Sequence, residues 1–145
     1  MMREPMARRI FAGLLFAYTL IMVYLLFLQR TPSDHASYNY IPLDTIRHQI
    51  GLLHTGAFAR FAFINLAGNV VMFIPLGLLP GVWEKQRRFG IYLLTVALAI
   101  ALVELLQLLT MLGSADIDDW LLNMIGAVIG FEIWRTIGRF FRLYK

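Results

Sequence analysis

The stretch F-G-I-Y-L-L-T-V-A-L-A-I-A-L-V-E-L-L-Q-L-L-T-M-L-G-S-A, from Phe89 to Ala115, decides the class of this protein. It contains 27 residues and a single charge, at Glu104. A transmembrane helix needs about 20 consecutive apolar residues, so this run is long enough to cross a bilayer. The residues that follow, D-I-D-D from Asp116 to Asp119, gather three of the nine acidic residues in the chain. The sequence therefore predicts a membrane helix that ends in an acidic turn.

The composition of the whole chain agrees with a membrane protein. Of its 145 residues, 59% are hydrophobic and 15% are charged, and the mean hydropathy is +0.68. Soluble domains average about 25% charged residues. The chain has no cysteine, which excludes disulfides, thiol catalysis and thiolate metal sites. Its length allows one domain. We therefore predict a single all-α transmembrane domain over residues 1–145, with no nucleic-acid partner.

Four apolar segments are predicted to span the membrane, over about residues 10–29, 62–82, 89–112 and 119–137. The first apolar run, Ile10–Leu28, has 19 uncharged residues. This is longer than the roughly 7–15 apolar residues of a signal peptide, so an uncleaved helix is preferred to a cleaved signal. Pro75 and Pro80 predict a kink or an early end in the second span. The fourth span is the weakest, because it holds only if the carboxylate of Glu132 reaches the interface.

The distribution of lysine and arginine predicts the orientation. Ten of the thirteen lie at the N-terminus, between the second and third spans, or at the C-terminus, as Arg3, Arg8, Arg9, Lys85, Arg87, Arg88, Arg135, Arg139, Arg142 and Lys145. Positively charged connections stay in the cytoplasm. We therefore predict a protein of the bacterial cytoplasmic membrane with both termini in the cytoplasm and the D-I-D-D turn outside.

The connection between the first two spans contains a further helical pattern. Ile46, Ile50, Leu53 and Ala57 recur at the spacing of one helix face. This favours a short amphipathic helix that lies on the outer leaflet over an ordinary exposed helix.

The strongly polar side chains within the spans lie in the predicted outer half. Each of three spans contributes a pair at i,i+3 or i,i+4 spacing, which places both members on one helix face. The pairs are Asn65 with Asn69, Glu104 with Gln107, and Asp119 with Asn123. A carboxylate within a span normally faces the bundle interior or a water-filled cavity. Together with Asp116 and Asp118, these residues predict a polar pocket that opens to the outside.

Simpler interpretations exist for several of these residues. The two asparagines could form hydrogen bonds between helices, and Gly126 and Gly130 match a small-x-x-x-small packing motif. The three aspartates could cap the fourth span, where acidic groups interact well with the helix dipole.

Glu104 is harder to explain in this way. A buried carboxylate needs a proton, a metal ion or a cationic partner, for which Arg47 and Arg60 are the candidates. With a proton retained, Glu104 could act as a general acid or base, and Asp119 is a second candidate for that role. Carboxylate and amide oxygens would also suit Ca²⁺ or Mg²⁺, bound at Glu104, Asp118 and Asp119.

Four motifs, in order along the chain, resemble the VanZ-like family of bacterial membrane proteins. They are N-Y-I-P-L-D-T-I (Asn39–Ile46), N-L-A-G-N-V-V-M-F-I-P-L-G (Asn65–Gly77), E-L-L-Q (Glu104–Gln107) and D-I-D-D-W-L-L-N-M-I-G (Asp116–Gly126). Many members carry an arginine six residues after the glutamine, where this chain has Gly113. If that arginine neutralises the carboxylates, another group such as Arg47 or Arg60 has to replace it here.

The resemblance implies a role in the cell envelope. The family takes its name from a member associated with low-level resistance to teicoplanin, which binds cell-wall precursors outside the membrane. This suits an outward-facing pocket that binds or modifies a lipid head group, a lipid-linked wall precursor or a lipoglycopeptide. One alternative is a lipid-modifying enzyme, for which Ser114 is a weak candidate nucleophile. Another is a small proton-coupled transporter or an assembly scaffold. Four short spans would also allow the protein to form a homo-oligomer.

Overall fold

The computed structural model describes residues 5–28, 37–56, 58–78 and 89–143. Their elements are, in chain order, helix α1 (Pro5–Val23), π-helix η1 (Tyr24–Leu28), strand β1 (Ser37–Asn39), helices α2 (Asp44–Thr55), α3 (Ala59–Gly77) and α4 (Phe89–Thr110), strand β2 (Ser114–Asp116) and helix α5 (Ile117–Leu143).

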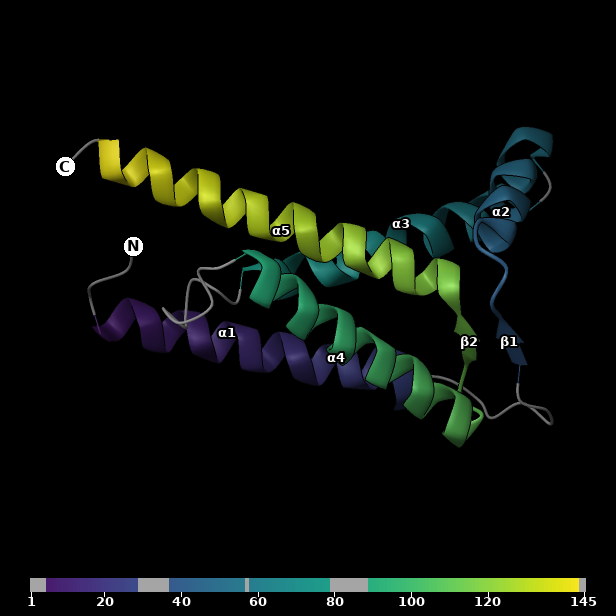
Figure 1. Cartoon of the computed structure of the whole chain (residues 1–145), viewed down its shortest axis with the longest axis horizontal. Coiled ribbons are helices and arrows are strands. Elements are labelled where there is room, and N and C mark those ends of the chain that lie inside the picture. The colour runs from purple at the N-terminus through teal and green to yellow at the C-terminus, as the bar shows by residue number, and fades with distance from the viewer. Residues whose placement is uncertain (1–4, 29–36, 57, 79–88, 144–145) are drawn as a thin grey trace.

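The four long helices form a bundle, in which α3 packs against α1 and α5, and α4 packs against α5 (Figure 1). Helix α2 and the two strands lie at one end of this bundle, whereas the start of α1 and the end of α5 lie at the opposite end. Among the described residues, three helical segments are long and apolar enough to cross a membrane, Arg9–Leu28, Ala59–Gly77 and Phe89–Thr110. Helix α5 does not meet the same criteria, so its place as a fourth span stays a prediction.

The outward surface of the bundle is apolar, as expected of helices that contact lipid. On α4, leucines at i,i+4 spacing form an exposed stripe, with Leu94 and Leu98 both 63% exposed and Leu102 55% exposed. A monomeric soluble protein rarely exposes such a contiguous patch. The interior is smaller and contains, among others, Phe73, Tyr92, Val96, Ile100, Ala127 and Phe131.

Helices α3 and α5 approach each other closely because glycines line their contact. A Cβ atom added at Gly126 or Gly130 would overlap the carbonyl oxygens of Val70 and Ile74, respectively, on α3. Gly77 meets the backbone of α5 in the same way. The predicted packing role of Gly126 and Gly130 is therefore confirmed, and these three glycines are called the glycine seam below.

Helix α4 is joined to the same part of α5 by aromatic side chains. The Tyr92 hydroxyl donates a hydrogen bond of 2.8 Å to the carbonyl of Ala127. Its ring stacks on Phe131 with the ring centroids 4.6 Å apart. One face of α5 thus contacts α3 and a neighbouring face contacts α4.

Two boundaries differ from the predicted spans. Helix α3 ends at Gly77, two residues after Pro75, in agreement with the early end that the prolines predict; residues 79–82 of that predicted span lie outside the described residues. Proline lacks an N–H group and clashes with the preceding turn, which favours a helix end here. Helix α5 begins at Ile117 and extends to Leu143, beyond both predicted limits.

The two short strands correct the expectation of a purely helical fold. Strands β1 and β2 pair in parallel, with Ser37 opposite Ser114 and Asn39 opposite Asp116. Each strand has only three residues, too few for the alternating pattern that reveals a strand in a sequence. Their pairing brings the connection before α2 directly against the acidic turn that leads into α5.

Candidate functional site

Asp118, in the first turn of α5, is a completely buried carboxylate. Its Oδ1 accepts a hydrogen bond of 2.6 Å from the backbone N–H of Leu43, and its Oδ2 accepts one of 3.1 Å from that of Ile46. These N–H groups belong to the start of α2, where Leu43 occupies the N-cap position and offers no capping side chain. A helix start leaves N–H groups without partners and favours a negative charge. Asp118 therefore caps α2 from a distant part of the chain.

Asp116 occupies the position before α5 and caps that helix. Its Oδ1 accepts a hydrogen bond of 2.8 Å from the N–H of Asp118, which confirms the capping interpretation for one aspartate. Its Oδ2 accepts one of 2.6 Å from the hydroxyl of Thr45 on α2. The amide of Asn39 donates to Thr45 Oγ1 at 2.9 Å and to Asp116 Oδ1 at 3.4 Å. The same carboxylate thus fixes the start of α5, the first turn of α2 and the end of β1.

Glu104 reaches this network from α4. Its side chain is 9% exposed, and Oε2 accepts a hydrogen bond of 3.3 Å from the backbone N–H of Asp116. Helix α4 is therefore connected through β2 to the two helix starts. The residues Asn39, Thr45, Glu104, Asp116 and Asp118 are called the acidic end below.

A second polar cluster joins α3 to α5. The amide of Asn69 donates to Asp119 Oδ1 at 2.5 Å and to Asn65 Oδ1 at 3.3 Å. All three side chains are half-buried. The interhelical hydrogen bond that the simpler interpretation predicts is therefore present, and it places Asp119 beside the two asparagines.

Three buried amides complete the polar set. Gln107 donates from Nε2 to the carbonyl of Leu26 in η1, at 3.2 Å, so it faces the end of the first span rather than the acidic end. Gln49 on α2 and Asn123 on α5 are 6% and 3% exposed. Their oxygens, Oε1 and Oδ1, are buried and have no hydrogen-bond partner among the described residues. Most buried polar atoms in proteins are paired, so two free acceptors need an explanation.

The buried polar groups are concentrated at one end of the molecule. Six buried polar or charged side chains occur in the described part of the chain, Gln49, Glu104, Gln107, Asp116, Asp118 and Asn123. Those on α4 and α5 lie within about three helical turns of β2, Asp116 lies on β2 itself, and Gln49 lies on α2. This end carries α2 and the strands in Figure 1.

The two candidate cationic partners lie on the surface of this end. Arg47 on α2 and Arg60 on α3 are both exposed. Gly113, in place of the family arginine, lies in the turn between α4 and β2. No contact within the described ranges supports the prediction that Arg47 or Arg60 neutralises Glu104.

The predicted divalent-cation site also lacks support from the geometry. Both oxygens of Asp118 already accept backbone N–H groups. The ranges that the structure describes contain no group of three or more acidic or histidine side chains placed to hold a metal ion. A divalent cation at Glu104, Asp118 and Asp119 therefore stays a prediction from the sequence.

The pocket predicted from the sequence did not include three residues of this end of the bundle, namely Asn39, Thr45 and Gln49. The first two belong to the N-Y-I-P-L-D-T-I motif, whose polar positions are the signal that could have revealed them. Gln49 carries no such signal, because a single glutamine on an amphipathic helix is usually exposed.

Comparison with known proteins agrees with this arrangement of motifs. The model of the VanZ/LLP1 family matches residues 15–140. The chain belongs to the VanZ/LLP1 family. Protein VanZ of Enterococcus faecium is 28% identical over 122 residues, which cover 84% of this chain and 71% of that protein. No solved structure gives a significant match. The resemblance of the four motifs is thus confirmed, and with the apolar helices it identifies a VanZ-like membrane protein.

Proposed function

We propose that this VanZ-like protein crosses the bacterial cytoplasmic membrane four times, with α5 as the fourth span and both termini in the cytoplasm. The start of α1 and the end of α5 lie at the same end of the bundle, which supports an even number of spans (Figure 1). Ten of the thirteen lysines and arginines belong to segments that this orientation leaves in the cytoplasm. The end with α2 and the strands then faces the outside of the cell.

At this outer end, the protein binds or modifies a component of the cell envelope: a lipid head group, a lipid-linked wall precursor or a lipoglycopeptide. The observation that carries this proposal is the pair of buried acceptors without partners, Gln49 Oε1 and Asn123 Oδ1. They occur in a region where four elements already contribute buried polar groups. An unpaired buried acceptor costs about 1–3 kcal/mol, and a bound ligand that donates hydrogen bonds would remove that cost.

The chemistry of the outer end favours a ligand rich in hydrogen-bond donors. The acceptors without a partner are the amide oxygens of Gln49 and Asn123. Amide oxygens accept hydrogen bonds from hydroxyl, ammonium and amide groups. Sugars, amino head groups and peptides all carry such donors. The exposed guanidinium groups of Arg47 and Arg60 lie at the same end and suit a phosphate. The part of the ligand that carries hydrogen-bond donors would then contact the buried acceptors. A resistance role like that suggested by the family name would follow from binding at this end.

Binding is favoured over transport by the position of the polar groups. Within the described ranges, the buried carboxylate and amide side chains are confined to the outer end, and the buried hydroxyl of Tyr92 farther along α4 already donates to a backbone carbonyl. A proton or solute pathway normally requires polar groups through the span.

The proposal is tested in a strain that lacks the protein, complemented with wild type, Glu104→Gln, Asn123→Ala or Glu132→Gln. The readouts are teicoplanin susceptibility and the envelope lipid profile by mass spectrometry, at equal protein levels in the membrane fraction. We expect Glu104→Gln and Asn123→Ala to lose at least about 80% of the complemented difference. Glu132→Gln is the matched control, because Glu132 is a half-exposed carboxylate in the second half of α5, paired with Arg135 at 3.1 Å.

Normal complementation by both outer-end variants, at wild-type abundance, would refute the proposal. A changed lipid product in cells that overproduce the protein would assign turnover rather than binding to the site. An unchanged profile together with a susceptibility difference would assign binding.

A further inference from the structure

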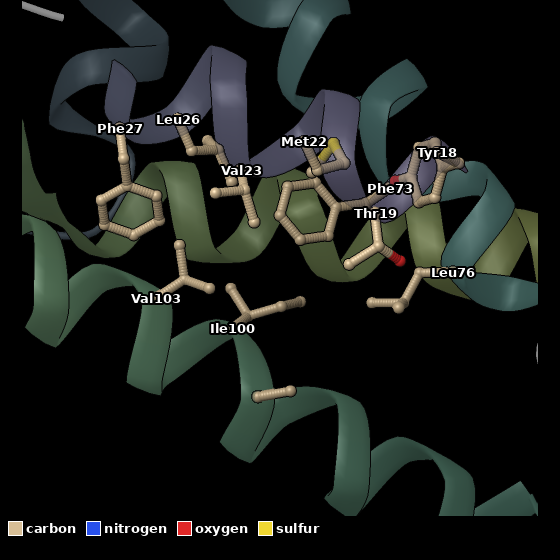
Figure 2. Close-up of a pocket in the computed structure, with 11 residues that line it drawn as sticks. Tyr18, Thr19, Met22, Val23, Leu26, Phe27, Phe73, Leu76, Ile100 and Val103 are labelled. Carbon is tan, nitrogen blue, oxygen red and sulfur yellow. The ribbon is translucent and has the colours of Figure 1, made fainter. Parts of the chain in front are cut away.

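An apolar crevice lies between α1, η1, α3 and α4, beside the polar end. It has a volume of about 170 Å³ and is lined by Tyr18, Thr19, Met22, Val23, Leu26, Phe27, Phe73, Leu76, Ala99, Ile100 and Val103. Figure 2 shows side chains of α1, α3 and α4 directed into it. Met22, Leu26, Phe73 and Ile100 are buried, whereas Thr19, Val23 and Ala99 are exposed. The crevice therefore has a closed floor and an open side that faces the membrane.

The crevice lies at a defined depth in the bilayer. Its lining on the first span runs from Tyr18 to Phe27, which is about 13 Å at the rise of a helix. This is the second half of the apolar segment Arg9–Leu28. In the proposed orientation it corresponds to the outer leaflet, whose hydrocarbon layer is about 15 Å thick.

The polar atoms at the crevice already have partners. The Tyr18 hydroxyl donates to the carbonyl of Met72, and the Thr19 hydroxyl donates to that of Leu15 at 2.8 Å. Neither hydroxyl has a hydrogen left to donate into the space, and the other lining side chains are apolar. A crevice of this kind, open to a bilayer, is filled by hydrocarbon.

The crevice and the polar end share a wall. Val103 lines the crevice, and the next residue, Glu104, bonds to the backbone of Asp116 at the acidic end. Leu26 lines the crevice with its side chain, and its carbonyl accepts the amide of Gln107. A ligand that occupied both regions would place an apolar chain within a residue or two of the buried polar groups. π-Helical turns such as η1 occur frequently at functional sites.

We infer that the crevice holds one acyl chain of a membrane glycerophospholipid whose head group lies at the polar end. This inference rests on the proposed function and adds the class of lipid to it. An apolar cavity of about 150 Å³ accepts a benzene molecule, so 170 Å³ accepts a chain segment of similar carbon content. The exposed guanidinium groups of Arg47 and Arg60 at the polar end suit the phosphate of such a head group.

The experiment uses the full chain in detergent micelles with a trace of phosphatidylglycerol that carries a diazirine in the middle of one acyl chain. Excess detergent covers the ordinary lipid-facing surface, so only a specific site retains the probe. After illumination, the labelled peptides are mapped by mass spectrometry. We expect labels at Met22–Phe27 and Ile100–Val103, at least fivefold above those at Leu94 and Leu98, which lie on the exposed face of α4.

Two variants separate the crevice from the outer surface. Ala99→Trp narrows the open side and is expected to reduce labelling at least fivefold, whereas Leu98→Trp on the exposed face leaves it unchanged. Unlabelled phosphatidylglycerol should displace the probe more effectively than polyprenyl phosphate. Equal labelling of the crevice and the exposed leucines in wild type would overturn the inference, without reliance on any variant. Stronger displacement by polyprenyl phosphate would overturn the assignment to a glycerophospholipid.

These outcomes are distinct from those that test the proposed function. If the lipid probe labels the crevice but the Glu104→Gln and Asn123→Ala variants complement normally, the lipid site stands and the proposed function is refuted. If those variants lose complementation but the probe does not label the crevice, the proposed function stands and the lipid site in the crevice is refuted.

Discussion

The glycine seam and the acidic end hold the same helix, α5, by opposite means. At the seam, Gly77, Gly126 and Gly130 let the backbones of α3 and α5 approach until no side chain fits between them. At the acidic end, the carboxylates of Asp116 and Asp118 bind the first turns of α5 and α2 through hydrogen bonds. One contact is made by shape and the other by paired polar groups.

The difference follows from the surroundings of each region. Within a bilayer the hydrophobic effect does not bring helices together, so close packing of small residues has to do so. The acidic end instead assembles two helix starts and a strand pair, whose backbone N–H groups need acceptors. The seam should therefore be sensitive to added volume, and the acidic end to lost acceptors.

The largest effect is expected at the seam, for Gly130→Ala. The new Cβ would overlap the carbonyl oxygen of Ile74, and backbone on both sides leaves nowhere for it to move. Overpacking in a core typically costs about 1–3 kcal/mol, and we expect this position to reach or exceed the upper value. The measurement is the melting temperature of the purified protein in detergent. Gly68→Ala on α3 is the matched control, since an added Cβ there meets no atom within 4 Å. Equal melting temperatures for the two variants would show that the seam is not tightly closed.

A smaller effect is expected at the acidic end, for Asp118→Asn. The substitution keeps the size of the side chain but turns one acceptor into a donor that faces a backbone N–H. Hydrogen bonds to charged groups contribute about 1.5–3 kcal/mol, so we expect a loss of about 2–3 kcal/mol. Trypsin should also cut faster after Arg47, because the start of α2 is released. Asp44→Asn, an exposed acidic residue in the first turn of α2, is the control. If both variants are cut at the wild-type rate, Asp118 does not hold α2.

The sequence predicted the helices better than it predicted how the acidic turn is used. Length and hydropathy determine the three apolar helices, and Pro75 explains the early end of α3, because both signals are local. The i,i+4 spacing of Asn65 and Asn69 agrees with the hydrogen bond between their side chains, because this signal is also local. Asp118 was beyond such reasoning, because its partners at Leu43 and Ile46 are more than 70 positions away along the chain.

The same limit applies to the strands and to the crevice. The pairing of Asn39 with Asp116 joins two segments of three residues, and neither has a period to detect. The crevice depends on how α1, α3 and α4 diverge, which side-chain composition does not specify. Long-range contacts of this kind leave no periodic signal in the sequence, whereas periodicity reports only which face of a helix is apolar.

The smallest effect tests whether the hydroxyl of Thr45 belongs to the acidic end as an energetic unit. In Thr45→Val the side chain keeps its shape but loses a bond of 2.6 Å to Asp116 and one of 2.9 Å from Asn39. Asp116 retains the N–H of Asp118, and Asn39 can still donate to Asp116, so the network loses one member rather than its anchor. We expect destabilisation of about 1–1.5 kcal/mol, measured as a shift in melting temperature. The control is Thr95→Val on α4, where the exposed hydroxyl bonds only within its own helix, to the carbonyl of Ile91 at 2.8 Å.

In the double variant Thr45→Val, Asp118→Asn, the two losses of stability should not add, because both act on the docking of the same first turn of α2. Full additivity would mean that the capping of α2 and the Asn39–Thr45–Asp116 contacts are independent, and the acidic end would then be two sites rather than one.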